Sequence, residues 1–581
     1  MKTQCKQPAR NASLDSTSVA GGCSKTFEVT STDLEFYNKM QVPAPTHCPD
    51  CRNQRRMVWR NERILYERKC DLCSKALVSI YDPAGPYIVY CYECWYSDKW
   101  DALDYAQEID LDRPFFEQFK ELQIKVPRIY ALVVDNENSE YTNGSAYNKD
   151  CFLIFVSDHN EDAMYSYGIY NTVSSIDMLN CNKCEMCYYC IGCTNCYDVQ
   201  YSVDSANCNS SMFLIDCKGS NYCFMSYGLR NQEYVWKNKQ LTKEEYNEKF
   251  AALKRGSYGS IQKLKEDFRE LKLKHTFKYY HGLNNEKFSG DYLERCANTY
   301  ESFESYELDS CKFITHGNKI KDSYDGYVNV DQGELTYEIT SGISLYNTKF
   351  SYSFWHGKDS EYCDSCNYSD SLFGCVGMRK GKYSILNKQY SEEEYKKVKE
   401  KLIEHMSAKG GSASGGKQEV EYGEFFPAWV SPFSYNETVA QDHFPLKKED
   451  VISRDWNWKD TDEKEVKYST YRVPDNIETA KDDITKTFLT CESCKKNYRI
   501  LQNELAFYRK QNIPIPRTCF DCRHIERLHD RNPHALWHRQ CMCSQPDHDH
   551  EGQCPREFET AYSTDNPTIV YCEECYVKEV V

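Results

Sequence analysis

The sequence predicts a mainly β protein, in which a central parallel β-helix (a β-solenoid) with capping helices is flanked by cysteine-rich modules. Three observations predict this fold. Cysteine pairs near one end recur in register near the other end. Strand-like runs separated by Asn, Asp, Ser and Gly follow one another every ~10–18 residues without helices between them. The body also repeats itself at an offset of 149 residues. A β-sandwich is the alternative for the same rhythm of strands.

The two modules share one cysteine framework. A shift of 471 residues places Cys494, Cys519, Cys522 and Cys541 on Cys23, Cys48, Cys51 and Cys70. A shift of 481 places Cys554, Cys572 and Cys575 on Cys73, Cys91 and Cys94, so one ten-residue insertion accounts for the difference. Aromatic, Pro and Arg positions between the cysteines match as well, which indicates a duplicated module.

Grouping as C-x-x-C in a chain of 581 residues with 32 cysteines indicates metal binding in a reducing cytoplasm rather than a disulfide scaffold. Two C-x-x-C knuckles complete a tetrahedral zinc site with Zn–S distances of about 2.3 Å. Four knuckles per module therefore predict two ions per module and about four Zn²⁺ per chain. The predicted ligands are Cys5, Cys23, Cys48, Cys51, Cys70, Cys73, Cys91, Cys94, Cys491, Cys494, Cys519, Cys522, Cys541, Cys554, Cys572 and Cys575.

Sequential pairing of neighbouring knuckles is favoured, because each pair of knuckles then encloses a short β-hairpin. Crossed pairing, first with third and second with fourth, is the alternative. Ala20 stands where the first N-terminal ligand is expected, and Cys5 is predicted to replace it across the polar insertion Pro8–Gly22.

The ten-residue insertion of the C-terminal module adds further candidate ligands: Cys543, His548 and His550. Imidazole and thiolate are both zinc ligands, so one interpretation is an extra or alternative zinc site. The other is a solvated acidic loop in which the two histidines happen to flank Asp549.

The run Cys491-x-x-Cys494, Leu505-x-Phe507-Tyr508, a Pro and Cys519-x-x-Cys522-Arg523 resembles the family termed "probable zinc-ribbon", found in many bacterial proteins. The resemblance covers about 35 residues of each module. With the body, the chain resembles larger uncharacterised proteins of candidate-phyla bacteria. The resemblance implies structural zinc and a bacterial cytoplasmic setting, and it implies no established activity.

Arginines follow the second knuckle of each module, and they are candidates for nucleic-acid contact: Arg52, Arg55, Arg56, Arg60, Arg523, Arg527 and Arg531. Guanidinium groups suit phosphate oxygens. The alternative is that they pair with the acidic body of the same chain. The net charge of −16 weakens general affinity for nucleic acid.

The body contains six cysteines spaced three residues apart, from Cys181 to Cys196. They either stack as small apolar thiols in successive turns of the coil or form a polynuclear metal cluster. Stacking is favoured because no His or acidic partner accompanies them. Capping boxes at Thr242 with Glu245 and at Ser391 with Glu394 predict a helix after each half of the body.

These observations divide the chain into seven segments. They are residues 1–100, an N-terminal double zinc-ribbon module; 101–127, a helical connector; 128–275, a first β-solenoid half with capping helices; 276–406, a second half with a capping helix; 407–417, a flexible linker; 418–487, an aromatic and Pro-rich extended segment; and 488–581, a C-terminal double zinc-ribbon module.

No catalytic motif is recognised, and no apolar run is long enough to span a membrane. The sequence therefore predicts a non-catalytic, cytoplasmic zinc-binding scaffold or adaptor whose β-solenoid surface binds a protein partner. The alternatives are a nucleic-acid-associated protein using its Arg-rich module faces and a carbohydrate-active β-helix enzyme, for which the 47 tyrosines would suit sugar stacking.

Overall fold

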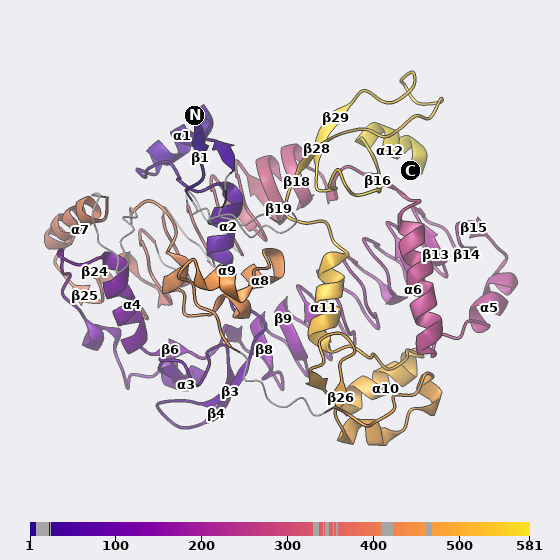
Figure 1. Ribbon diagram of the computed structural model, residues 1–581, viewed down its shortest axis with the longest axis horizontal. Helices are drawn as coiled ribbons and strands as arrows, with labels where there is room; N and C mark the ends of the chain where they lie inside the picture. Colours follow the sequence, from indigo (N-terminus) through magenta and orange to yellow (C-terminus); the bar gives the residue numbers. More distant parts are fainter. Residues whose placement is uncertain are drawn as a thin grey trace. The chain divides into compact units, whose positions relative to one another are not determined.

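The computed structural model describes residues 1–6, 23, 25–328, 336–340, 342, 348–352, 354–355, 358–407, 422–460 and 468–580 (Figure 1). The predicted linker 407–417 lies outside these residues, apart from Ser407. The chain divides into two compact units. The first comprises Met1–Ala131, Tyr280–Lys459 and His534–Leu536, and the second comprises Leu132–Tyr279, Asp460–Pro533 and Trp537–Val581. Each unit thus combines one cysteine-rich module with the half of the body that is more distant in sequence.

Parallel β-solenoid coils occupy the middle of the chain, so the predicted mainly β solenoid fold is confirmed. In the second unit, Met164 pairs with Phe152 and Met212 with Phe224, and in the first unit Tyr306 pairs with Asn318. Each of these partners lies one coil away, at a separation of 12 residues. The same separation appears in the hydrogen bond that Ile169 N donates to Ser157 Oγ. Parallel pairing of this kind distinguishes the fold from the alternative β-sandwich.

Most of the described coils consist of four three-residue segments, whereas the coil at β18 (Glu286–Glu294) is one residue shorter, since Gly282 pairs with Leu293. In the three-residue segments every third residue has a positive φ, as the run of Val156 (φ 52°), His159 (φ 58°) and Asp162 (φ 51°) illustrates. This left-handed conformation disfavours most side chains and is best tolerated by Gly, Asn and Asp. The abundance of those residues follows from this requirement. Their amides hold the coils together, since Asp162 N donates to Lys149 O at 3.0 Å.

The residue after each of these positions faces the interior of the coil, where Ser and Cys have the same role. Ser175 Oγ accepts a hydrogen bond from Cys187 N at 3.0 Å, and Cys181 Sγ accepts one from Cys193 N at 3.4 Å. The Cys181 thiol also lies 3.4 Å from Leu179 O. A small polar side chain thus satisfies a buried amide that would otherwise lack a partner. The six cysteines from Cys181 to Cys196 are all buried in this interior, which agrees with the stacking interpretation.

The capping helices form where the sequence predicts them. Thr242 and Glu245 form the capping box of α5 (Lys243–Ala251), and Ser391 Oγ accepts the amide of Glu394 at the start of α7 (Glu392–Ser407). The helix α6 (Tyr258–Lys272) follows α5 and packs against strand β13 (Phe224–Tyr227). No helix among the described residues is both long and apolar enough to cross a membrane.

The elements of the first unit are β1 (Lys2–Gln4), β2 (Thr26–Glu28), α1 (Ser31–Lys39), α2 (Pro49–Met57), β3 (Tyr66–Lys69), β4 (Ala76–Ser79), β5 (Val89–Tyr90), α3 (Tyr92–Trp95), α4 (Phe115–Lys125), β6 (Arg128–Ile129), β17 (Gly282–Leu283), β18 (Glu286–Glu294), β19 (Ala297–Asp309), β20 (Asn318–Lys321), β21 (Phe354–Trp355), β22 (Cys366–Asn367), β23 (Asp370–Phe373), β24 (Lys382–Ile385), β25 (Lys388–Gln389), α7, α8 (Val439–His443) and α9 (Lys448–Ile452).

The elements of the second unit are β7 (Val133–Val134), β8 (Thr142–Ala146), β9 (Phe152–Asp158), β10 (Met164–Tyr167), β11 (Tyr197–Gln200), β12 (Asn209–Ile215), β13 (Phe224–Tyr227), β14 (Val235–Trp236), β15 (Lys239–Gln240), α5, α6, β16 (Thr276–Lys278), β26 (Leu489–Thr490), β27 (Asn497–Tyr498), α10 (Gln502–Gln511), α11 (Phe520–His529), β28 (Trp537–Gln540), β29 (Glu557–Thr560), β30 (Ile569–Tyr571) and α12 (Glu573–Val580).

Candidate metal centres

Every predicted zinc site is built from the same two local structures. The first pair of ligands lies between two paired antiparallel strands, which are β1 and β2, β3 and β4, β26 and β27, or β28 and β29. The second pair lies at the start of a helix, and Cys48, Cys91 and Cys519 are the N-caps of α2, α3 and α11. Each pair of strands therefore frames one knuckle, rather than lying between two knuckles as we expected. Helix N-termini favour thiolate ligands, because their free amides carry partial positive charge.

The sixteen predicted cysteine ligands gather into four groups of four, and within each group all sulfur atoms lie within 4.8 Å of one another. The groups are Cys5, Cys23, Cys48 and Cys51; Cys70, Cys73, Cys91 and Cys94; Cys491, Cys494, Cys519 and Cys522; and Cys541, Cys554, Cys572 and Cys575. They follow the sequential order of the knuckles and not the crossed order.

The spacing of the sulfur atoms matches a tetrahedral ion site. Sγ–Sγ distances are 3.5 Å for Cys23 and Cys48, 3.7 Å for Cys73 and Cys91, and 3.8 Å for Cys491 and Cys522. A tetrahedron with Zn–S bonds of about 2.3 Å has edges of about 3.8 Å. The four groups could therefore hold metal ions with all four positions filled by protein thiolates, which is typical of structural zinc.

One backbone hydrogen bond recurs in all four groups. The amide of the third ligand donates to the sulfur of the first ligand. In the four groups, Cys48 N donates to Cys5 Sγ at 3.2 Å, Cys91 N to Cys70 Sγ at 3.3 Å, Cys519 N to Cys491 Sγ at 3.3 Å and Cys572 N to Cys541 Sγ at 3.2 Å. A hydrogen bond from a backbone amide stabilises negative charge on the sulfur that accepts it.

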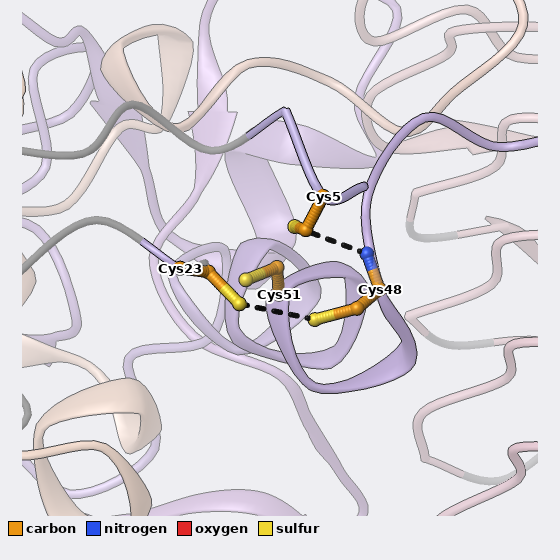
Figure 2. Close-up of side chains that lie close together, drawn as sticks. All are labelled: Cys5, Cys23, Cys48 and Cys51. Atoms are coloured by element: carbon orange, nitrogen blue, oxygen red, sulfur yellow. Dashed lines mark hydrogen bonds between the residues drawn. The ribbon is translucent and has the colours of Figure 1, made fainter. Parts of the chain in front are cut away.

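Cys5 occupies the place of the missing first ligand. Figure 2 shows its sulfur gathered with those of Cys23, Cys48 and Cys51. Cys5 accepts the same backbone hydrogen bond as Cys491 does in the C-terminal module, so it is the structural equivalent of Cys491. The segment between Cys5 and Cys23 belongs largely to the residues that the structure does not describe.

The first ligands of two sites are poised to ionise. Burial alone would raise the pKa of Cys70, but amides of Cys91, Cys73 and Leu72 outweigh it and lower the pKa to about 7. At Cys491, burial again raises the pKa, but hydrogen bonds from the amides of Cys494, Cys519 and Ser493 outweigh it and lower the pKa to about 7. A thiol must lose its proton to bind zinc, so these amides favour metal binding near neutral pH.

The candidate ligands of the C-terminal insertion also come together. Cys543, His548 and His550 form a fifth group with Cys575, again within 4.8 Å. Cys575 thus belongs to two groups. The sequence identified the three residues of the insertion but not this sharing.

The arginines that follow the second knuckle are turned into their own unit. Arg52, Arg56 and Arg60 are at most 6% exposed, as are Arg523 and Arg527. Arg55 is 12% exposed and lies 2.7 Å from Glu424 Oε2, and Arg531 is half-buried. Guanidinium groups buried in this way do not form a phosphate-binding surface, and the nucleic-acid alternative is therefore not favoured.

Two pairs of these arginines bind buried aspartates of the solenoid. Arg523 Nε and Arg527 Nη1 donate to the carboxylate of Asp177 at 2.7 and 2.8 Å. In the other unit, Arg52 Nε and Arg56 Nη1 donate to Asp325 Oδ1 at 2.8 and 3.3 Å. Both aspartates are fully buried.

One arginine of each pair also contacts a cysteine knuckle of a candidate metal site. Arg52 Nη1 donates to His47 O at 2.7 Å, and Arg523 Nη1 donates to Thr518 O at 2.7 Å. Those carbonyls immediately precede Cys48 and Cys519. In each unit an arginine therefore links the loop of a candidate metal site to a buried carboxylate of the solenoid. The sequence contained the repeated arginines, but the aspartates were missed because Asp is common throughout the body.

Comparisons with known proteins do not identify the chain. No protein-family model matches it, and no curated protein matches it. Among solved structures, one described as "putative acetyltransferase" from Desulfovibrio desulfuricans G20 is 10% identical, with a TM-score of 0.10, and the match covers 51% of this chain and 78% of that one. A likeness at this TM-score carries no argument about fold or activity. The resemblance to the zinc-ribbon family stays a prediction.

Proposed function

We propose that this protein is a non-catalytic zinc-binding scaffold that presents a β-solenoid surface to a protein partner. One observation carries the scaffold part of the proposal. In both units the helix that begins at a candidate metal site places two arginines on a buried aspartate of the solenoid. Zinc in such a site has four protein ligands and no open position for a substrate, so its role is to hold the module against the solenoid.

The outer faces of the coils offer side chains suited to protein recognition. Tyr147 is 53% exposed, Tyr197 48% and Tyr222 39%. Tyrosine supplies a large apolar contact area together with a hydroxyl group, and it is enriched at protein interfaces. The net charge of −16 favours a partner with a basic surface, because complementary charge speeds association and selects among partners.

Cross-linking in cells that express the full chain tests the proposal. An amine-reactive cross-linker followed by mass spectrometry should join exposed solenoid lysines, such as Lys149 and Lys183, to one recurrent protein. A variant with Tyr147→Ala, Tyr197→Ala and Tyr222→Ala should lose these cross-links while its zinc content stays unchanged. Recovery of the chain without a protein partner, or ultraviolet cross-linking to nucleic acid in its place, would refute the proposal.

A further inference from the structure

The C-terminal module differs from its N-terminal copy by a loop that folds back onto a candidate metal site. The backbone of this loop is fixed beside the site, because Cys554 N donates to Cys543 O at 2.8 Å and Gln553 Nε2 donates to Cys541 O at 3.0 Å. Cys543 is fully buried as a result, although it belongs to none of the four all-cysteine groups. The N-terminal module has only Asp71 and Leu72 between the corresponding cysteines and offers no equivalent of this loop.

The loop carries two imidazoles to the same place. His548 Nδ1 lies 3.0 Å from Cys543 Sγ, and His550 Nε2 lies 3.5 Å from Cys575 Sγ. Ligand atoms bound to one tetrahedral zinc ion, at about 2.0–2.3 Å, are separated by about 3.5 Å. Two thiolates and two imidazoles are a donor set typical of tetrahedral zinc.

His550 has the hydrogen bond expected of a metal ligand. Its Nδ1 lies 2.9 Å from Gly552 O, and only a protonated Nδ1 can donate to a carbonyl. The lone pair is then on Nε2, the atom that faces Cys575. Zinc-bound histidines usually donate their second ring N–H to a carbonyl or carboxylate, which fixes the tautomer in this way. Gly552, at φ 64°, provides the turn that brings its carbonyl to the ring.

We propose that the C-terminal module holds a binuclear zinc centre in which the sulfur of Cys575 bridges two ions. Cys541, Cys554 and Cys572 complete the coordination of one ion, and Cys543, His548 and His550 complete that of the other. A thiolate sulfur keeps lone pairs after binding one ion, so it can bind a second. The added ion also makes an otherwise negative four-thiolate centre less negative, since it brings only one further thiolate.

The inference rests on the proposed zinc binding by the Cys541 group, and the test separates the two. Full-length protein is purified from zinc-supplemented medium, and zinc per chain is measured by elemental analysis. The double variant His548→Ala with His550→Ala should contain one ion fewer than the wild type. These substitutions lie in a partly exposed loop and leave all four all-cysteine groups intact.

A matched pair of cysteine variants tests the bridge itself. Cys575→Ser should remove two ions, whereas Cys94→Ser, at the corresponding position of the N-terminal module, should remove one. In protein loaded with ¹¹³Cd²⁺ instead, two cadmium resonances should show scalar coupling through the shared sulfur, and the histidine double variant should lose both the coupling and one resonance.

Three results would overturn the inference. The first is a histidine double variant with the zinc content of the wild type, and the second is a Cys575→Ser variant that loses only one ion. Either leaves the proposed function in place, because the four all-cysteine groups still bind. Protein that binds no zinc at all would refute both proposals together.

Discussion

At the scale of single residues, two buried aspartates connect the modules to the solenoid. Asp177 and Asp325 each face two arginines and are fully removed from solvent. Removing one partner of a buried ion pair leaves the other charge uncompensated, which is far more costly than the net contribution of the pair. These aspartates are therefore expected to be among the most sensitive positions of the chain.

Replacing Asp177 by Asn tests this expectation. Asn tolerates the positive φ of 59° at this position and preserves the shape of the side chain, but it removes the carboxylate charge that both buried guanidinium groups contact. We expect a loss of about 3–5 kcal/mol in the free energy of unfolding, measured by urea denaturation. Asp150→Asn, at an exposed position with φ 53°, is the control and should change stability little. Equal stability of the two variants would contradict the account.

Cys187 tests the role of the interior cysteines. Ser175, in the same position one coil earlier, accepts the amide of Cys187, so serine already fits this column. Cys187→Ser should cost less than about 1.5 kcal/mol, because the hydroxyl can donate to Glu185 O as the thiol does. Cys187→Phe should cost about 1–3 kcal/mol or more through overpacking. Zinc content should be unchanged in Cys187→Ser. A loss of metal in that variant would instead support a polynuclear cluster in the body.

At the scale of elements, one knuckle between paired antiparallel strands and one at a helix start form every site. Cys5 is informative because it is separated from Cys23 by a long insertion and still accepts the backbone hydrogen bond found in the other sites. A ligand supplied by a distant segment contributes to the site as long as the sulfur reaches the same corner of the tetrahedron.

Cys5→Ser should therefore remove one zinc ion per chain, which elemental analysis measures. Cobalt substitution offers a second readout, since losing one thiolate weakens the sulfur-to-cobalt charge-transfer absorption. The control is Cys187→Ser, which removes a buried thiol outside the sites. If Cys5→Ser kept the full metal content and absorption, Cys5 would be no ligand.

The sequence allowed the knuckles, their sequential order and the capping helices to be predicted, because each depends on a local pattern such as Thr242 with Glu245. The solenoid was recognised as well, but its 12-residue coil of three-residue segments was not. The cysteines from Cys181 to Cys196 are three residues apart, so their spacing already contained the three-residue period. The arginine contacts were not predictable, since they depend on which half of the body each module packs against, and local patterns do not determine that.

At the scale of the whole molecule, the chain is two units that interleave in sequence. Each unit has a double cysteine module, a stretch of solenoid and a buried Arg–Asp–Arg contact between them. Because those arginines lie in helices that begin at the candidate metal sites, the proposed zinc binding and the packing of the module on the solenoid are expected to be coupled.

Removing zinc with a chelator should therefore loosen both units and not only the knuckles. Structural zinc contributes about 10–16 kcal/mol in small zinc peptides, enough to determine whether such a module is folded. Hydrogen exchange should show faster exchange in α2 and α11 and in the coils around Asp325 and Asp177, and adding zinc back should restore protection. Exchange confined to the knuckles would indicate that the modules dock without metal.

The most direct test of the four-thiolate centres is zinc X-ray absorption on the purified full-length chain, with zinc content determined on the same sample. We predict at least four ions per chain, one for each all-cysteine group, and a dominant shell of sulfur at about 2.3 Å. A chain without stoichiometric zinc, or with zinc surrounded mainly by oxygen while the cysteines are joined in disulfides, would contradict the account.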